Sequence, residues 1–343
     1  MRACVIHGAE DLRLEDRPEP TPGPGEVLLA IRAGGICGSD LHYFFEGRNG
    51  DFVVREPLVP GHEVAGEVAA IGPGITRVAP GDRVAVHPGR ACGQCRACKE
   101  GRGNLCRNVF FLGSASRFPH MQGGFSDFLL VHESQCHPVS PKLPFTIAAF
   151  AEPLAVCLHA VSRAGTVLGR TALITGAGPI GLLTLLSLRR AGAAHIAVTD
   201  MLDPPLALAA SLGADATHNV AADPDSPARA PEGYDLAFEC SGNPAALSSS
   251  LRHVRPGATV VQVGTLPPGG VTIPGNLVMA KEIDLRGSMR FDTEFSHAVE
   301  CLDRGLIDVR PLLTGTRPAS DAVAAFHLAR DRRNHAKVQI LFG

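Results

Sequence analysis

The chain has 343 residues, which corresponds to two domains at roughly 150 residues each. Its 32 Lys and Arg residues nearly balance its 34 Asp and Glu residues, and the formal net charge is −2. This balance, together with two Tyr and no Trp, argues against a nucleic-acid surface or a membrane surface as partner. The ten cysteines follow no secretory signal, so we expect a reducing, cytoplasmic compartment in which clustered thiols bind metal.

Short apolar runs separated by Gly and Pro dominate residues 1–147, which predicts a β-rich domain. Residues 148–288 instead alternate strand and helix patterns. The mixed pattern then returns over 289–343, which has too little apolar material for a core of its own. We therefore predict one domain from 1–147 plus 289–343, into which a second domain, 148–288, is inserted.

The inserted region predicts an α/β fold with a Rossmann-type doubly wound parallel sheet, because buried parallel strands joined by helices form such sheets. The uncharged run 171–188 is long enough to suggest a membrane span, but three glycines and a proline interrupt it. We interpret it as a strand, a loop and a helix. The expected strands are 171–176, 195–200, 234–240 and 258–264, and the expected helices are 179–191, 204–212 and 244–254.

A G-x-G-x-x-G motif follows the first of these strands. Gly176 would allow a tight turn, Gly178 would let the backbone approach a pyrophosphate, and Gly181 would let helix and strand pack closely. Asp200 ends the next strand, where a carboxylate can hold both hydroxyls of an adenosine ribose and would repel a 2′-phosphate. Asp200 therefore favours NAD over NADP. The alternative is a Gly-rich turn beside an aspartate that happens to end a strand.

Four cysteines within one loop predict a closed tetrahedral zinc site, which would be structural because no position is left open for chemistry. An iron–sulfur cluster and a redox-active thiol pair are the alternatives. The four are Cys92, Cys95, Cys98 and Cys106, in a lobe of about residues 89–110.

A second, more dispersed set of candidate ligands predicts a catalytic zinc site with three protein ligands and one open position. Cys37 and His62 are the first two candidates. Glu63 is the third, with Glu152 beside the metal or exchanging with Glu63. Spacing alone leaves the structural alternative open, because isolated Cys, His and Glu residues usually have no metal.

Together these motifs resemble the zinc-dependent medium-chain alcohol dehydrogenases, and within them the polyol branch. The resemblance covers almost the whole chain. It implies a GroES-like catalytic domain that carries the Rossmann-type domain. It rests on the four-cysteine lobe and on residues 35–43, 61–63, 152–154 and 176–181.

The resemblance also implies site roles residue by residue. Cys37, His62 and Glu63 would bind the catalytic zinc, with Glu152 near the metal-bound water, and Ser39 and His42 would pass the alcohol proton outward. Substrate contacts are implied for Tyr43, Glu152, Arg290 and Phe291. The cofactor path is implied to include Ile180, Asp200, Val263, Gly264, Thr265 and Arg290. One position departs from the pattern, because Pro205 stands where polyol relatives carry an Arg that helps to hold the adenosine ribose, so NADP use stays open.

Residues 110–115, 118–120 and 287–291 resemble the sugar-acid members of the branch more than its sorbitol members, which implies L-idonate as substrate. Arg290 is the candidate cation for the substrate carboxylate. Sorbitol, xylitol and L-threonine are alternative substrates, and a non-catalytic, zinc-stabilised nucleotide-binding protein is the alternative from another class. The resemblance further implies a homo-oligomer, a tetramer or a dimer, with small-molecule substrates and no nucleic-acid or membrane partner.

Overall fold

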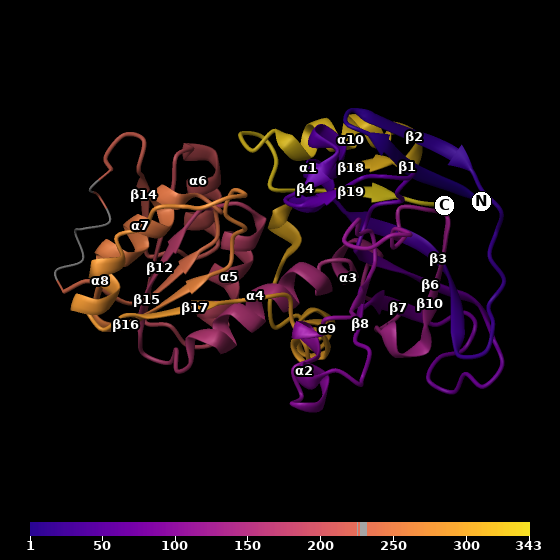
Figure 1. Ribbon diagram of the computed structural model, residues 1–343, viewed down its shortest axis with the longest axis horizontal. Coiled ribbons are helices and arrows are strands. Elements are labelled where there is room, and N and C mark those ends of the chain that lie inside the picture. Colours follow the sequence, from indigo (N-terminus) through magenta and orange to yellow (C-terminus); the bar gives the residue numbers. More distant parts are fainter. Residues whose placement is uncertain (225, 227–231) are drawn as a thin grey trace. The chain divides into compact units, whose positions relative to one another are not determined.

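The computed structural model describes residues 1–224, 226 and 232–343. Its contacts divide the chain into two units, each with its own sheets (Figure 1). Unit 1 comprises Met1–Glu152, Phe295–Asp331 and Lys337–Gly343, and unit 2 comprises Pro153–Glu294 and Arg332–Ala336.

These bounds differ from the predicted domain boundaries, which lie between residues 147 and 148 and between residues 288 and 289. The prediction also assigned all of residues 289–343 to one domain. In the structure the segment Arg332–Ala336 belongs to unit 2. The physical reason is an ion pair between the Arg332 guanidinium and the Asp200 carboxylate, which ties this short segment to unit 2.

Unit 1 is built on a seven-stranded sheet in which β3 (Glu26–Gly35) is central. The strand order is β11-β7-β6-β3-β19-β18, and β10 also pairs with β3. Most pairs are antiparallel, whereas β18 and β19 are parallel. The other strands of this sheet are β6 (Glu63–Ile71), β7 (Arg83–Val86), β10 (Phe128–His132), β11 (Cys136–Pro138), β18 (Leu313–Pro318) and β19 (Lys337–Leu341).

Three short two-stranded sheets and several helices complete unit 1. The strand pairs are β1 (Arg2–Gly8) with β2 (Asp11–Asp16), β4 (Arg48–Asn49) with β5 (Phe52–Val53), and β8 (Gly89–Arg90) with β9 (Phe110–Phe111). The helices are α1 (Gly38–Glu46), α2 (Arg96–Lys99), α3 (Phe145–Ala148) and α10 (Ala322–Arg330), with 3-10 turns at Gly103–Leu105, Glu133–Gln135, Arg310–Leu312 and Ala319–Asp321. Two helices contain the unit boundaries: α4 (Ala151–Ala164) and α9 (Glu294–Asp303).

The core of unit 1 forms where α1 and α10 pack against its strands. Phe44 of α1 contacts Phe326 of α10, with ring centroids 5.2 Å apart, and Phe125 lies 6.3 Å from the same ring. All three side chains are buried, with inward-facing Val27 and Leu29 of β3 in the same cluster. Burial of this apolar surface fixes the loops that begin and end at β3 and β6, and those loops carry the candidate metal ligands.

Unit 2 contains the parallel sheet that the sequence predicts, with six strands, of which the sequence predicted four. Its strand order is β14-β13-β12-β15-β16-β17, with the reversal of winding direction between β12 and β15 (Figure 1). The strands are β12 (Thr171–Thr175), β13 (His195–Asp200), β14 (Ala216–Asn219), β15 (Tyr234–Glu239), β16 (Val254–Gln262) and β17 (Asp284–Gly287). The helices are α5 (Pro179–Arg190), α6 (Asp203–Ser211), α7 (Pro244–His253) and α8 (Gly275–Ala280).

One helical stretch of the described residues, Phe145–Ala164, is long and apolar enough to cross a membrane by length and composition. Of its most apolar 18 residues, 61% are buried inside the protein, and buried core helices of globular proteins share this length and composition. The run 171–188 forms β12, the following loop and most of α5, as predicted.

Candidate metal centres and dinucleotide site

The first candidate metal centre lies in unit 1, where β3 and β6 bring two distant segments together. Gly35 near the end of β3 pairs with Glu63 at the start of β6, so Cys37 comes next to His62. The donor atoms of Cys37, His62 and Glu63 all lie within 4.8 Å of one another. A Cβ atom on Gly35 would lie 2.1 Å from Glu63 Oε2, so only glycine leaves room for this carboxylate.

Asp40 holds the two ligand-bearing segments in place. Its buried carboxylate accepts hydrogen bonds from the backbone N–H groups of Cys37 (2.9 Å) and Gly61 (3.2 Å), and its Oδ1 lies 3.8 Å from His62 Nδ1. Burial raises the pKa of Asp40. Burial lowers the pKa of His62, but the negative charges of Asp40 and Cys37 outweigh it and raise that pKa well above its ordinary value.

Lys337 places a buried positive charge against the third ligand. Its Nζ donates to Glu63 Oε1 at 2.6 Å and to the Ile36 carbonyl at 3.0 Å. Burial lowers the pKa of Lys337, but the charge of Glu63 outweighs it and the pKa is raised. Neither Asp40 nor Lys337 was predicted from the sequence as part of the site. Asp40 has a local signal, because it lies three residues after Cys37 in the first turn of α1, whereas Lys337 has none.

Glu152 adds a second carboxyl group to this region. It lies in the first turn of α4 and is buried. Burial raises its pKa to about 7, with further electrostatic contributions from His62, Glu63 and Lys337. A carboxyl group with this pKa can take up and release a proton near neutral pH, which is the property of a general base or proton relay.

These residues fit a zinc ion. His62 Nδ1 is buried and has no hydrogen-bond partner among the residues that the structure describes. A thiolate, an imidazole and a carboxylate are the ligand types that zinc prefers, and three such ligands leave one coordination position open. Glu152 is not part of the compact donor group, which favours Glu63 as the third ligand.

The second candidate metal centre is the four-cysteine lobe. Its four Sγ atoms all lie within 4.8 Å of one another, and the pairing of β8 with β9 closes the lobe at its base. Backbone N–H groups of Cys92 and Asn108 donate to Cys106 Sγ at 3.2 and 3.3 Å. N–H groups of Cys98 and Arg107 lower the pKa of Cys95 to about 6 and so favour the thiolate. These four thiols fit a closed zinc shell.

The glycine-rich loop of unit 2 has the conformation that the motif predicts. Gly176 has a φ of 98°, which favours glycine, and a Cβ atom on Gly181 would lie 1.8 Å from the Gly176 carbonyl oxygen. Gly178 precedes Pro179 as the N-cap of α5, and Ile180 lies in the first turn of that helix. The helix N-terminus and its loop therefore present backbone N–H groups, as phosphate-binding loops do.

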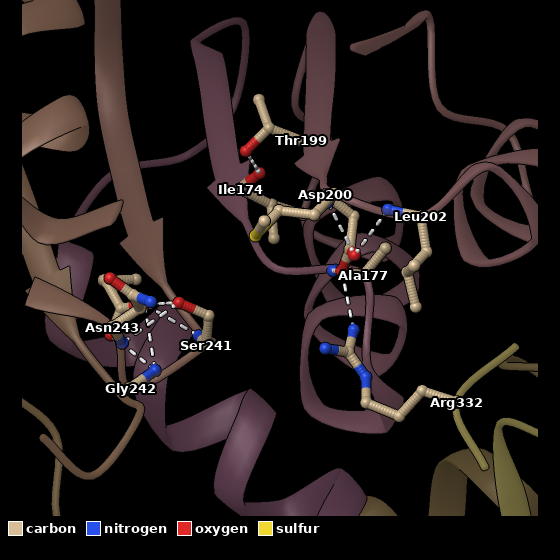
Figure 2. A network of polar contacts seen from close by, with 11 residues as sticks. Ile174, Ala177, Thr199, Asp200, Leu202, Ser241, Gly242, Asn243 and Arg332 are labelled. Atoms are coloured by element: carbon tan, nitrogen blue, oxygen red, sulfur yellow. Dashed lines mark hydrogen bonds and ion pairs between the residues drawn. The ribbon is translucent and has the colours of Figure 1, made fainter. Parts of the chain in front are cut away.

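Asp200 ends β13 beside this loop (Figure 2). Its carboxylate accepts backbone N–H groups from Ala177 and Met201, both at 2.8 Å, and from Leu202 at 3.1 Å, and Arg332 Nη2 donates to it at 2.7 Å. Asp200 and Arg332 line a pocket of about 690 Å³ at the carboxyl ends of the strands. Ligands of doubly wound sheets bind at this edge.

A second network at the same edge holds the loop after β15. Glu239 is fully buried and accepts N–H groups from Ser241 at 2.7 Å and Gly242 at 3.0 Å (Figure 2). Its backbone carbonyl accepts N–H groups from Val263 and Gly264 at 2.9 and 2.8 Å. A Cβ atom on Gly264 would lie 2.2 Å from Gly242 N, so the segment that contains Val263, Gly264 and Thr265 packs closely on this loop.

The other predicted site residues take varied positions. Ser39 is half-buried in the first turn of α1, and His42 is exposed and pairs with Glu46 at 2.8 Å. Tyr43 is buried, and its hydroxyl accepts the Ala115 N–H at 3.1 Å. Arg290 and Phe291 belong to unit 2 rather than to the domain to which the sequence assigned them. Their substrate contacts stay predictions.

Comparisons with known proteins match both units. Residues 23–141 match the alcohol dehydrogenase GroES-like domain, and residues 179–304 match the zinc-binding dehydrogenase domain. The L-idonate 5-dehydrogenase (NAD(P)(+)) of Escherichia coli K12 is 39% identical to this chain over 344 residues, covering 99% of the chain and 98% of that protein. The chain belongs to the zinc-binding alcohol dehydrogenases.

Other relatives place this dehydrogenase in the polyol branch. The sorbitol dehydrogenase of Gallus gallus is 39% identical over 334 residues, 96% of this chain and 93% of that protein. The crystal structure of the Escherichia coli L-idonate 5-dehydrogenase matches with a TM-score of 0.95 and 38% identity, covering 99% of this chain and 98% of that one. A Sinorhizobium meliloti zinc-binding dehydrogenase bound to NADP matches with a TM-score of 0.90 and 30% identity, covering 99% and 98%. The predicted family and fold class are confirmed.

Proposed function

We propose that this dehydrogenase oxidises a secondary hydroxyl group of a sugar acid, L-idonate to 5-keto-D-gluconate, reversibly and with NAD or NADP. The observation that carries the proposal is the compact group of Cys37, His62 and Glu63, with the buried Glu152 nearby. The dinucleotide loop of unit 2 would hold the cofactor that accepts the hydride.

The chain's residues have distinct roles in this reaction. Cys37, His62 and Glu63 would hold a zinc ion, which would supply Lewis-acid polarisation and so lower the pKa of an alcohol. Glu152, with its pKa raised by burial to about 7, accepts the proton. Ser39 and His42 pass it outward, His42 being on the exposed side of α1. The loop 176–181 and Asp200 bind the dinucleotide that takes up the hydride.

The choice of a sugar acid is supported by the segment that begins at β9. The Phe111 ring lies 5.5 Å from the His62 ring, and Ala115 contacts the Tyr43 hydroxyl, so this segment borders the metal ligands. The alignment with the Escherichia coli L-idonate 5-dehydrogenase, at 39% identity, covers 99% of the chain. Arg290 is the proposed cation for the substrate carboxylate.

Sorbitol or xylitol oxidation is the second candidate, and the identity to the Gallus gallus sorbitol dehydrogenase supports it. A substrate panel of L-idonate, D-gluconate, sorbitol, xylitol and L-threonine, each with NAD and with NADP, separates the candidates. We expect the highest kcat/KM for L-idonate. Highest kcat/KM for sorbitol or xylitol would contradict the sugar-acid assignment, and no turnover by zinc-loaded protein would favour a non-catalytic nucleotide-binding protein.

The metal assignment is tested on the same samples with Cys37→Ser. We expect this variant to lose turnover and the zinc of this site while it keeps its thermal unfolding temperature and its binding of NADH. Cys301→Ser is the control, because Cys301 is also half-buried but is absent from both candidate metal groups. Full activity of Cys37→Ser would overturn the assignment.

We also propose that the enzyme acts in the cytoplasm as a homo-oligomer, a dimer or a tetramer. The support is the resemblance to its family. Light scattering coupled to size-exclusion chromatography measures the mass of the zinc-loaded protein, and a monomer would contradict the proposal.

A further inference from the structure

The carboxylate that would bind the adenosine ribose already has a positively charged partner. Arg332 Nη2 donates to Asp200 Oδ2 at 2.7 Å (Figure 2). The Asp200 side chain is 3% exposed, whereas the Arg332 side chain is 49% exposed. Asp200 is therefore held inside the protein by backbone N–H groups, while Arg332 reaches it from the solvent side.

The Arg332 guanidinium also lies close to the phosphate-binding loop. Its Nη2 is 4.0 Å from the position that a Cβ atom would have on Gly178. A guanidinium carries five N–H donors in a planar fork that matches the oxygens of a phosphate. Its Nη2 bond to Asp200 uses part of that donor set, and the exposed half of the side chain is accessible to a ligand.

The charges that line the pocket favour an anion. Among its described lining residues, Asp200 is the only carboxylate, and two arginines, Arg332 and Arg252, also line the pocket. An unpaired aspartate at this place repels a second negative charge, which is the usual basis for rejecting a 2′-phosphate. Here the ion pair with Arg332 offsets the charge of Asp200, and Arg252 of α7 adds a further positive charge.

We propose that Arg332 makes this pocket tolerant of a 2′-phosphate on the adenosine ribose, with Arg252 as the second phosphate-binding cation. This proposal rests on the proposed function, because it requires this pocket to bind the dinucleotide. With NAD, Asp200 accepts the ribose hydroxyls and keeps its pair with Arg332. With NADP, the guanidinium groups of Arg332 and Arg252 donate hydrogen bonds to the phosphate oxygens.

Binding of cofactor fragments tests this without relying on turnover. Calorimetry on the zinc-loaded full chain measures Kd for 5′-AMP, adenosine 2′,5′-bisphosphate, NADH and NADPH. We expect Arg332→Gln to weaken the bisphosphate and NADPH about 10-fold to 100-fold, the range for a lost charge-assisted hydrogen bond, and 5′-AMP and NADH less than about threefold. Arg252→Gln should show the same preference with a smaller effect, and Arg332→Lys should retain most of the bisphosphate binding.

Arg190→Gln is the matched control, because Arg190 is an exposed arginine of the same unit outside the pocket lining. It should change none of the four dissociation constants. Equal weakening of NADH and NADPH by Arg332→Gln would overturn the proposal, because it would indicate a pyrophosphate contact or a purely structural role. Failure of the wild-type chain to bind the bisphosphate would also overturn it.

Two further measurements keep the results separable. Thermal unfolding without ligand shows whether Arg332→Gln folds. If it does not fold, Arg252→Gln provides the test. Unchanged NADPH binding by Arg252→Gln overturns the proposal, whereas weaker NADPH binding with unchanged NADH binding supports it. If the enzyme does not turn over L-idonate but Arg332→Gln selectively weakens NADPH binding, the proposed substrate is contradicted and the role of Arg332 is supported.

Discussion

The pair of Lys337 and Glu63 buries two opposite charges next to the proposed zinc ligands. The side chains are 3% and 2% exposed. Such a pair is stable because each charge compensates the other, and removing one partner leaves the other charge buried without compensation. A bound zinc ion would compensate Glu63 as well, so Lys337 and zinc share one carboxylate.

We therefore expect Lys337→Met to lower the free energy of unfolding of the chelator-treated protein by about 3–5 kcal/mol, the range for breaking a buried ion pair. The loss should be smaller in zinc-loaded protein, because the metal then holds the negative charge of Glu63. Urea unfolding with and without zinc measures both values. Lys142→Met, at an exposed lysine, is the control and should change neither. Equal losses in both states would contradict zinc binding by Glu63.

Asp235 stabilises unit 2 in a pH-dependent way. It accepts hydrogen bonds from Thr171 N (2.8 Å), Arg255 Nε (2.8 Å) and Arg170 Nη1 (3.2 Å). Burial raises the pKa of Asp235, but these hydrogen bonds outweigh it and lower the pKa to about 2. Because the folded-state pKa lies below the unfolded value of about 3.9, the stabilisation is fully present above about pH 4 and is lost as the pH falls through about 2.

Asp235→Asn tests this pH dependence. Near pH 6 the variant should be less stable than the wild type by about 1–2 kcal/mol, a value reduced for partial solvent exposure. The pH-dependent part of that difference should vanish near pH 2. The midpoints of urea unfolding of the wild type and the variant, measured between about pH 2 and pH 6, test this expectation. Asp284→Asn, at an exposed aspartate paired with Arg286, is the control and should show a much smaller effect. A difference that does not change with pH would contradict the assignment.

The turn between β12 and α5 uses its glycines for different purposes. A Cβ atom on Gly181 would overlap the Gly176 carbonyl oxygen at 1.8 Å, whereas a Cβ atom on Gly178 would meet only Arg332, at 4.0 Å. Gly178 also has a φ of −72°, which any residue adopts. The fold therefore requires glycine at 181 but not at 178, where the space is left for a ligand.

We predict that Gly178→Ala folds with an unfolding temperature close to that of the wild type but binds NADH at least about tenfold more weakly, because the methyl group occupies the space for the pyrophosphate. Gly181→Ala is the comparison and should lower the unfolding temperature by several degrees or prevent folding. Thermal unfolding and NADH titration of both variants provide the test. Unchanged NADH binding by Gly178→Ala would show that the dinucleotide does not approach this backbone.

Four of the six strands of the parallel sheet, β12, β13, β15 and β16, were predictable because each has a local signal, whereas the short edge strands β14 and β17 were not predicted. Strand 195–200 has an apolar centre, Ile196-Ala197-Val198, and helix α5 begins at a proline after glycines, so their predicted bounds agree with the structure within about two residues. Strand β16 is different. It begins at Val254, not at residue 258, because Val254 pairs with Tyr234 despite the turn-like sequence Arg255-Pro256-Gly257. The pairing partner, not the local sequence, determines that boundary.

At the scale of the whole molecule, two of the unpredicted site residues, Lys337 and Arg332, have partners that are far away in the sequence. Residue types that zinc prefers, together with the resemblance to the family, indicated Cys37, His62 and Glu63. Lys337 lies 274 residues from Glu63, and Arg332 lies 132 residues from Asp200. Both come from the last part of the chain, which supplies one charged side chain to each unit. Only the folded chain reveals such positioning residues.

The four-cysteine lobe depends on its metal more than on packing. Between residues 91 and 110, Cys106 is the only buried residue, so no apolar core holds the loop. Where a site does not exist without its metal, the free energy of metal binding is free energy of folding. The lobe should therefore lose its order locally when its zinc is removed, while the remainder of unit 1 keeps its own core.

Cys95→Ser tests this separation of the two metal centres. We expect the variant to lose one of the two zinc ions that the two donor groups would hold, and to become sensitive to proteases within residues 89–110. The zinc at Cys37, His62 and Glu63 should remain, because that site rests on β3, β6 and β19. Metal analysis and limited proteolysis measure these effects, with Cys301→Ser as control. Full zinc content and wild-type protease resistance in Cys95→Ser would show that packing or another thiol chemistry, not zinc, holds this lobe.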